Sequence, residues 1–63
     1  MSVEEKIRAY ITDKKIQLAT LAKRADITED ILKDIIEGHR TADCIEYHNI
    51  CKALRVPLKT FME

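Results

Sequence analysis

Apolar residues recur along the chain at the three- and four-residue spacing of an amphipathic helix. The first such stripe, over residues 3–11, follows a Ser-x-x-Glu sequence at Ser2 to Glu5, which is typical of a helix N-terminus. This helix is expected to end near residues 13–15, where the stripe stops. A second stripe over residues 18–25 predicts another short helix.

Three more segments complete the pattern. Thr28 can cap a helix with an apolar face at positions 31, 32, 35 and 36, and Gly38 would end it. A fourth stripe covers residues 44–54, and Pro57 is placed to begin a short amphipathic segment up to residue 62. We therefore predict an all-α fold, a compact bundle of five short helices around one aliphatic core. The expected core is Ile7, Ile11, Leu21, Ala22, Ile27, Leu32, Ile35, Ile50, Leu54, Leu58 and Phe61.

Length and composition agree with a small helical domain. The chain has 63 residues, which predicts a single domain over residues 1–63. A chain of this size buries only roughly 60% of its unfolded surface, so it has little core to spare. It contains one glycine and one proline, too few for the tight turns of a β-rich protein. Eleven basic residues balance eleven acidic ones.

Several classes of protein are excluded by what the chain lacks. No apolar stretch approaches the roughly 20 residues that span a bilayer, and the N-terminus does not resemble a signal peptide. We therefore expect a cytoplasmic protein that does not enter a membrane. Cys44 and Cys51 lie seven residues apart in a helical stripe, about 10 Å along the axis, which is too far for a disulfide. Both are expected to be reduced, buried thiols.

Catalytic and metal-binding arrangements are not evident. Cys44, His48 and Cys51 fall on one side of a helix, but one straight helix cannot place three ligands around a tetrahedral zinc ion. No plausible Ser-His-Asp or Cys-His-Asn set and no glycine-rich phosphate loop is present. The prediction is a protein that is not an enzyme and has no cofactor or metal.

The most informative stretch covers residues 18–37. Two short predicted helices are joined by only a few residues around Asp26 and Ile27, and the small Ala22 lies where the helices must cross closely. This is the layout of a helix-turn-helix, in which the second helix is presented to a major groove.

With these features, the sequence resembles the Cro/C1-type helix-turn-helix family of phage and bacterial regulators, which has the lambda-repressor-like fold. The resemblance extends from about Ile7 to Met62. Leu21-Ala22 resembles the family's Leu-Ala pair, and Asp26-Ile27-Thr28 stands where the family usually has Gly-Val-Ser. Further matching segments are Leu32, Ile35 and Gly38 to Arg40 at the end of the recognition helix, and residues 50–58 at the fourth helix and the step that follows it.

The resemblance implies a sequence-specific regulator of transcription that binds double-stranded DNA, acting as a homodimer that doubles the length of the recognised site. The residues expected to face bases are Thr28, Glu29, Asp30, Lys33 and Asp34. Those expected to contact phosphates are Gln17, His39 and Arg40. The C-terminal segment has apolar area to spare, and the predicted dimer surface is Val56, Leu58, Phe61 and Met62.

The predicted recognition helix is acidic, which departs from what DNA binding requires. Residues 28–37 contain four acidic side chains and Lys33 alone as a cation, a net charge of minus three. Affinity for DNA comes mostly from cations that neutralise phosphates. A second hypothesis is therefore a protein-binding modulator or anti-repressor, which uses this acidic helix to cover the basic surface of a partner regulator.

Overall fold

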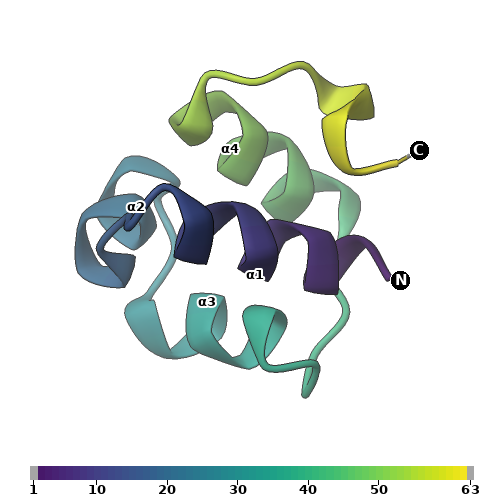
Figure 1. The fold of residues 1–63 in the computed structure, drawn as a ribbon. Coiled ribbons are helices and arrows are strands. Elements are labelled where there is room, and N and C mark those ends of the chain that lie inside the picture. Colours follow the sequence, from purple (N-terminus) through teal and green to yellow (C-terminus); the bar gives the residue numbers. More distant parts are fainter. Residues whose placement is uncertain (1, 63) are drawn as a thin grey trace.

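A computed structural model describes residues 2–62 of the protein, which form four α-helices and one short 3-10 helix (Figure 1). The elements are α1 (Val3–Asp13), α2 (Leu18–Arg24), α3 (Glu29–Ile36), α4 (Cys44–Leu54) and the 3-10 helix η1 (Leu58–Phe61). No strand occurs within residues 2–62, which agrees with the all-α prediction. The prediction of five helices was wrong for the last segment, which forms a 3-10 turn and not an α-helix. Four residues are little more than one turn, and this turn closes with i to i+3 bonds, such as Thr60 N–H to the Pro57 carbonyl.

In Figure 1, α1 crosses the view between α3 below it and α4 above it. α2 packs against both α3 and α4, α1 packs against α3, and η1 closes against α1 and α4. The molecule is nearly spherical, with extents of 26 × 24 × 23 Å along its principal axes. None of the helices in the described chain has the length and apolar character needed to cross a membrane.

Three helices begin at capping side chains. At α1, the Glu5 N–H donates to Ser2 Oγ at 3.1 Å and the Ser2 N–H donates to Glu5 Oε1 at 3.0 Å, which confirms the predicted capping box. Thr28 Oγ1 accepts from the Ile31 N–H at 3.1 Å and caps α3 as predicted. Asp43 forms a second capping box with Glu46 at α4. Each such cap contributes about 1 kcal/mol to helix stability.

All four α-helices end in the same left-handed turn. The residue with positive φ is Lys15 after α1, Asp26 after α2, Gly38 after α3 and Arg55 after α4. In each turn, the N–H of the next residue donates to a carbonyl five positions earlier, the long bond of a Schellman motif. These bonds are Ile16 to Ile11, Ile27 to Ala22, His39 to Asp34 and Val56 to Cys51, at 2.9–3.1 Å.

Only one of the four ends carries the glycine that usually marks this motif. After the other three, the residue that follows the left-handed position is apolar and half-buried against the core: Ile16, Ile27 and Val56. A hydrophobic contact at this position commonly accompanies the motif. Burial therefore offsets the cost of placing a side chain other than glycine in the left-handed region.

The core agrees with the predicted set at most positions. Its buried members are Ile7, Ile11, Leu21, Ala22, Ala25, Leu32, Ile35, Tyr47, Ile50, Cys51 and Phe61. Ile27 and Leu54 are half-buried and pack against this cluster. The prediction was wrong for Leu58, which is 45% exposed. Leu58 begins the short η1 turn at the edge of the core, and Phe61 at its end takes the inward position.

Phe61 connects the C-terminal turn to the rest of the molecule through two aromatic contacts. Its ring meets Tyr10 of α1 edge-on, with centroids 5.7 Å apart, and Tyr47 of α4 in the same way at 6.4 Å. The Tyr47 hydroxyl also donates a hydrogen bond to the Leu58 carbonyl. Such edge-to-face pairs contribute about 0.5–1.5 kcal/mol beyond the area they bury.

The two cysteines differ in environment, so the expectation that both are buried was wrong for one of them. Cys44 is the first residue of α4 and is exposed, whereas Glu46 and Tyr47 in the same turn are buried. Cys51 is buried two turns later, and burial raises the pKa of its thiol. Both thiols are free.

Candidate functional site

The candidate site is built on the α2–α3 pair. The two helices pack against each other and are joined by residues 25–28. Asp26 stands where the resembled family has glycine, and its φ of 58° confirms that aspartate adopts the left-handed conformation the turn requires. Ala25 and Ile27 on either side of Asp26 turn toward the core, which holds the turn in place.

The outward side of α3 carries the residues predicted to face bases. Leu32 and Ile35 are fully buried on the inner side of the helix, and Ile31 and Ile36 are half-buried beside them, so the charged positions point outward. Thr28, at the N-cap, is exposed together with the charged residues of the helix. We call these charged residues the acidic face: Glu29, Asp30, Lys33, Asp34 and Glu37.

The acidic face is not neutralised within the molecule. It carries four carboxylates and one ammonium group, and none of them forms a salt bridge with another described residue. Its first-turn carboxylates, Glu29 and Asp30, lie where negative charge favours the helix dipole. Glu29 and Asp30 therefore stabilise the start of α3, while the other charged groups of the acidic face are directed to solvent.

Two of the three predicted phosphate contacts are exposed polar groups near helix ends. Gln17 is the N-cap residue of α2 but makes no capping bond to the backbone. Its Oε1 instead accepts a long hydrogen bond of 3.5 Å from Thr20 Oγ1. His39 follows the left-handed Gly38 and is exposed. Gln17 and Thr28 thus mark the N-terminal ends of the two helices of the pair.

The third predicted phosphate contact, Arg40, is already occupied by a carboxylate. Its Nη2 lies 2.6 Å from Glu46 Oε2, and the Glu46 side chain is only 11% exposed, whereas that of Arg40 is 45% exposed. The hydrogen bond from Arg40, followed by the bond from the Asp43 N–H, holds the pKa of Glu46 below its ordinary value. Glu46 was not among the predicted site residues. The available signal was the Asp43-x-x-Glu46 spacing, which predicts a capping box and so places Glu46 at the start of α4.

The loop that carries Arg40 is also held from α1. Glu4 Oε2 accepts a hydrogen bond of 3.2 Å from the Ala42 N–H, across 38 residues of sequence. The Arg40–Glu46 pair restrains the same loop from α4. The α3–α4 connection is therefore attached to two helices, which limits how far Arg40 can move toward a ligand.

This pairing predicts a pH-dependent stability. Glu46→Gln keeps the shape of the side chain and the oxygen that accepts from Asp43, but removes the charge next to Arg40. Because the folded-state pKa of Glu46 is depressed, its charge stabilises the fold above the ordinary value of 4.5, and this stabilisation is lost as the pH falls through the folded pKa. Urea unfolding should show the wild type more stable than Glu46→Gln near neutral pH. The difference should shrink as the pH falls below 4.5 and vanish once the pH lies below the depressed folded-state pKa of Glu46.

A second variant separates charge from packing in that experiment. Arg40→Gln removes the partner and should abolish most of the same pH dependence. A stability difference between wild type and Glu46→Gln that stays constant from neutral to acidic pH would contradict the ionic explanation.

The predicted dimer surface is only partly available. Leu58 and Met62 are exposed and Val56 is half-buried, but Phe61 is 3% exposed. The prediction was therefore wrong for Phe61, because its ring fills the space between Tyr10 and Tyr47. One exposed apolar side chain was not predicted: Ile45 in the first turn of α4 is 72% exposed.

Neither a metal-binding cluster nor a similar known protein identifies the function of this site. Within residues 2–62, no three His, Cys, Asp or Glu side chains are placed to hold a metal ion. No protein-family model, curated protein or solved structure matches the chain. The function is therefore argued from the geometry and charge of the molecule itself.

Proposed function

We propose that the protein is a cytoplasmic, sequence-specific DNA-binding regulator of transcription, with the lambda-repressor-like fold of the Cro/C1-type family. The observation that carries this proposal is the α2–α3 pair. Its tight turn contains a left-handed Asp26, and α3 is anchored by the fully buried Leu32 and Ile35 while its opposite side is open. A short helix fixed on one side and free on the other has the geometry of a recognition helix in a major groove.

In this mechanism, α3 enters the groove and its polar side chains meet base edges. Lys33 can donate to guanine O6 and N7, while Glu29 and Asp30 can accept from cytosine N4. Gln17 and His39 would contact phosphates beside the groove. Arg40 uses one Nη for Glu46, and the other donors of its guanidinium can still reach a phosphate.

A homodimer would supply the length of DNA that one copy cannot read. The largest extent of the molecule is 26 Å, whereas the half-sites of such regulators lie about 34 Å apart. The exposed Leu58 and Met62, with the half-buried Val56, offer the apolar area for this contact.

A second candidate function is favoured by the acidic face and the occupied Arg40. Four carboxylates without salt bridges on α3 would have to approach DNA phosphates, while one of the nearby cations is already neutralised. The same face complements the basic surface of a DNA-binding partner. In this case the protein is an anti-repressor or modulator, and charge complementarity mainly accelerates and orients the encounter.

One double substitution distinguishes the two functions. Changing Glu29 and Asp30 to glutamine removes two negative charges from the acidic face. If α3 enters DNA, binding to a promoter fragment at low salt should be equal or stronger, by up to about thirtyfold, because each of the two exposed charges near a phosphate interacts by roughly 0.5–1 kcal/mol. If α3 meets a basic protein, association should become slower and less dependent on salt. Electrophoretic shifts and surface plasmon resonance measure these two outcomes.

Asp13→Asn serves as the control, because Asp13 is an exposed acid at the end of α1 and does not belong to the acidic face. It should leave both kinds of binding unchanged. Thermal unfolding of the double variant must also be measured, since the lost carboxylates favour the α3 dipole. Failure of the wild type to bind any DNA at low salt, where phosphate attraction is strongest, would refute the first function.

A further inference from the structure

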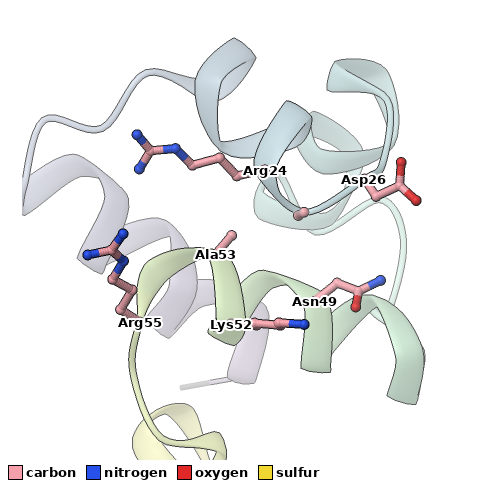
Figure 2. A pocket seen from close by; sticks show the side chains of 7 residues that line it. Arg24, Asp26, Asn49, Lys52, Ala53 and Arg55 are labelled. Atoms are coloured by element: carbon pink, nitrogen blue, oxygen red, sulfur yellow. The ribbon is translucent and has the colours of Figure 1, made fainter.

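Cations gather around a groove between α2 and α4. A cavity of about 530 Å³ opens between the turn that ends α2 and the last turns of α4. Its polar lining includes Arg24, Asn49, Lys52 and Arg55, together with one acid, Asp26 (Figure 2). None of its lining residues belongs to α3, so this groove is separate from the acidic face.

The cations of the groove have no counter-ion. Arg24, Lys52 and Arg55 form no salt bridge within the described chain. In Figure 2, the side chains of Arg24 and Arg55 extend toward the same side of the groove, whereas Lys52 points the other way, toward Asn49, and the Asp26 carboxylate lies at that other end. The two like charges of Arg24 and Arg55 repel each other, and a bound anion would relieve this repulsion.

A second cavity, with one apolar wall, continues the groove beyond these cations. It has a volume of about 330 Å³ and shares Arg24, Ala53 and Arg55 with the first. Ile16, Leu21 and Leu54 contribute its apolar wall. Each cavity falls in the size range of small-molecule sites, and charged groups beside apolar ones would fix the orientation of a ligand.

Arg55 lies where the two cavities meet, because it lines both of them. It ends α4 with φ 60° and ψ 42°, in the same left-handed stop that ends the other α-helices. The position of this stop brings its guanidinium to the groove.

We propose that this groove binds a small organic phosphate. Arg24 and Arg55 hold the phosphate group, because two cations match a dianion and arginine presents paired donors to its oxygens. The apolar wall of the second cavity holds the uncharged body of the ligand. This site goes beyond the proposed function and does not depend on it.

The test uses phenyl phosphate as the probe, added to the whole protein at constant ionic strength and followed by amide NMR shifts. Saturable shifts should appear around Arg24 and Arg55. Inorganic phosphate should bind about tenfold more weakly, because it lacks the apolar body. The key variant is Arg55→Gly, which should weaken phenyl phosphate binding by about tenfold, since a hydrogen bond to a charged group is lost.

Arg55→Gly also separates binding from folding. Glycine is favoured in the left-handed region, so the variant should unfold at the same temperature as the wild type or up to about 4 °C higher. Lys15→Gly is the matched control, because Lys15 is a cation with φ 55° that lines neither cavity. It should show the same thermal behaviour and unchanged binding of phenyl phosphate.

Three results would overturn the proposal. The first is a set of shifts that does not saturate, or that spreads equally to cations outside the groove such as Arg8. The second is an equal loss of binding in Arg55→Gly and Lys15→Gly. The third is a response of the groove residues to duplex DNA but not to phenyl phosphate, which would assign the groove to nucleic acid.

Discussion

Replacing Leu21 with alanine should cost about 2–5 kcal/mol of unfolding free energy, the range for deleting a buried leucine side chain. Leu21 is 2% exposed and lies on α2, which packs against both α3 and α4. A chain of 63 residues is expected to have a total stability of only roughly 3–9 kcal/mol. The variant should therefore be largely unfolded, or lose most of its midpoint concentration in urea unfolding followed by circular dichroism.

Ile45→Ala provides the matched control for this loss. Ile45 is also aliphatic and helical but is 72% exposed, so its truncation should change the stability by no more than about 0.5 kcal/mol. Comparable losses in the two variants would mean that α2 is not packed as described.

Phe61→Ala should have an effect of similar size, about 3–5 kcal/mol, although Phe61 belongs to the shortest element of the fold. The ring is 3% exposed and contacts Tyr10 of α1 and Tyr47 of α4. Its removal opens a cavity and also detaches the η1 turn from both helices. The expected readouts are a lower urea midpoint and earlier proteolytic cleavage after residue 56.

Phe61→Leu tests whether volume or aromatic geometry is responsible. Leucine fills part of the space but cannot form the edge-to-face contacts, so we expect an intermediate loss. If Phe61→Ala costs less than about 1 kcal/mol, the C-terminal turn is not part of the core. Phe61 would then be available for the dimer surface.

Helix starts were predictable because their signals are local and chemical. The Ser2–Glu5 capping box and the Thr28 cap involve side chains that bond to backbone three residues away, and the structure confirms both. Most of the core followed from the same periodicity, since helices with one apolar stripe must bury it.

The approximate helix ends followed from where each apolar stripe stops, but residue type marked the left-handed stop only at Gly38 and, more weakly, at Asp26. Lysine and arginine have no preference for the left-handed region, so Lys15 and Arg55 carried no compositional signal. The apolar residues that follow them, Ile16 and Val56, are the ones that mark these turns. In the sequence alone they cannot be distinguished from the apolar residues of a helical stripe.

Long-range pairings in the candidate site were the least predictable feature. The sequence gives no sign that Arg40 has a partner, but in the structure it pairs with Glu46, because the capping box at Asp43 brings Glu46 to the same loop. Likewise, the cations of the groove come from the ends of two helices separated by nearly 30 residues. Only packing of α2 against α4 brings them to one cavity.

The repeated left-handed stop after each α-helix has a consequence for how the chain folds. Each stop is closed by bonds between residues that are near in sequence, so helix boundaries can be set before distant segments meet. Most contacts in the fold are also short-range in sequence. Such a topology has little loop-closure entropy to overcome in its transition state, and helical domains with mainly local contacts fold in microseconds to milliseconds. The protein should accordingly reach its native state quickly, with the docking of η1 onto α1 as the contact that spans the most chain.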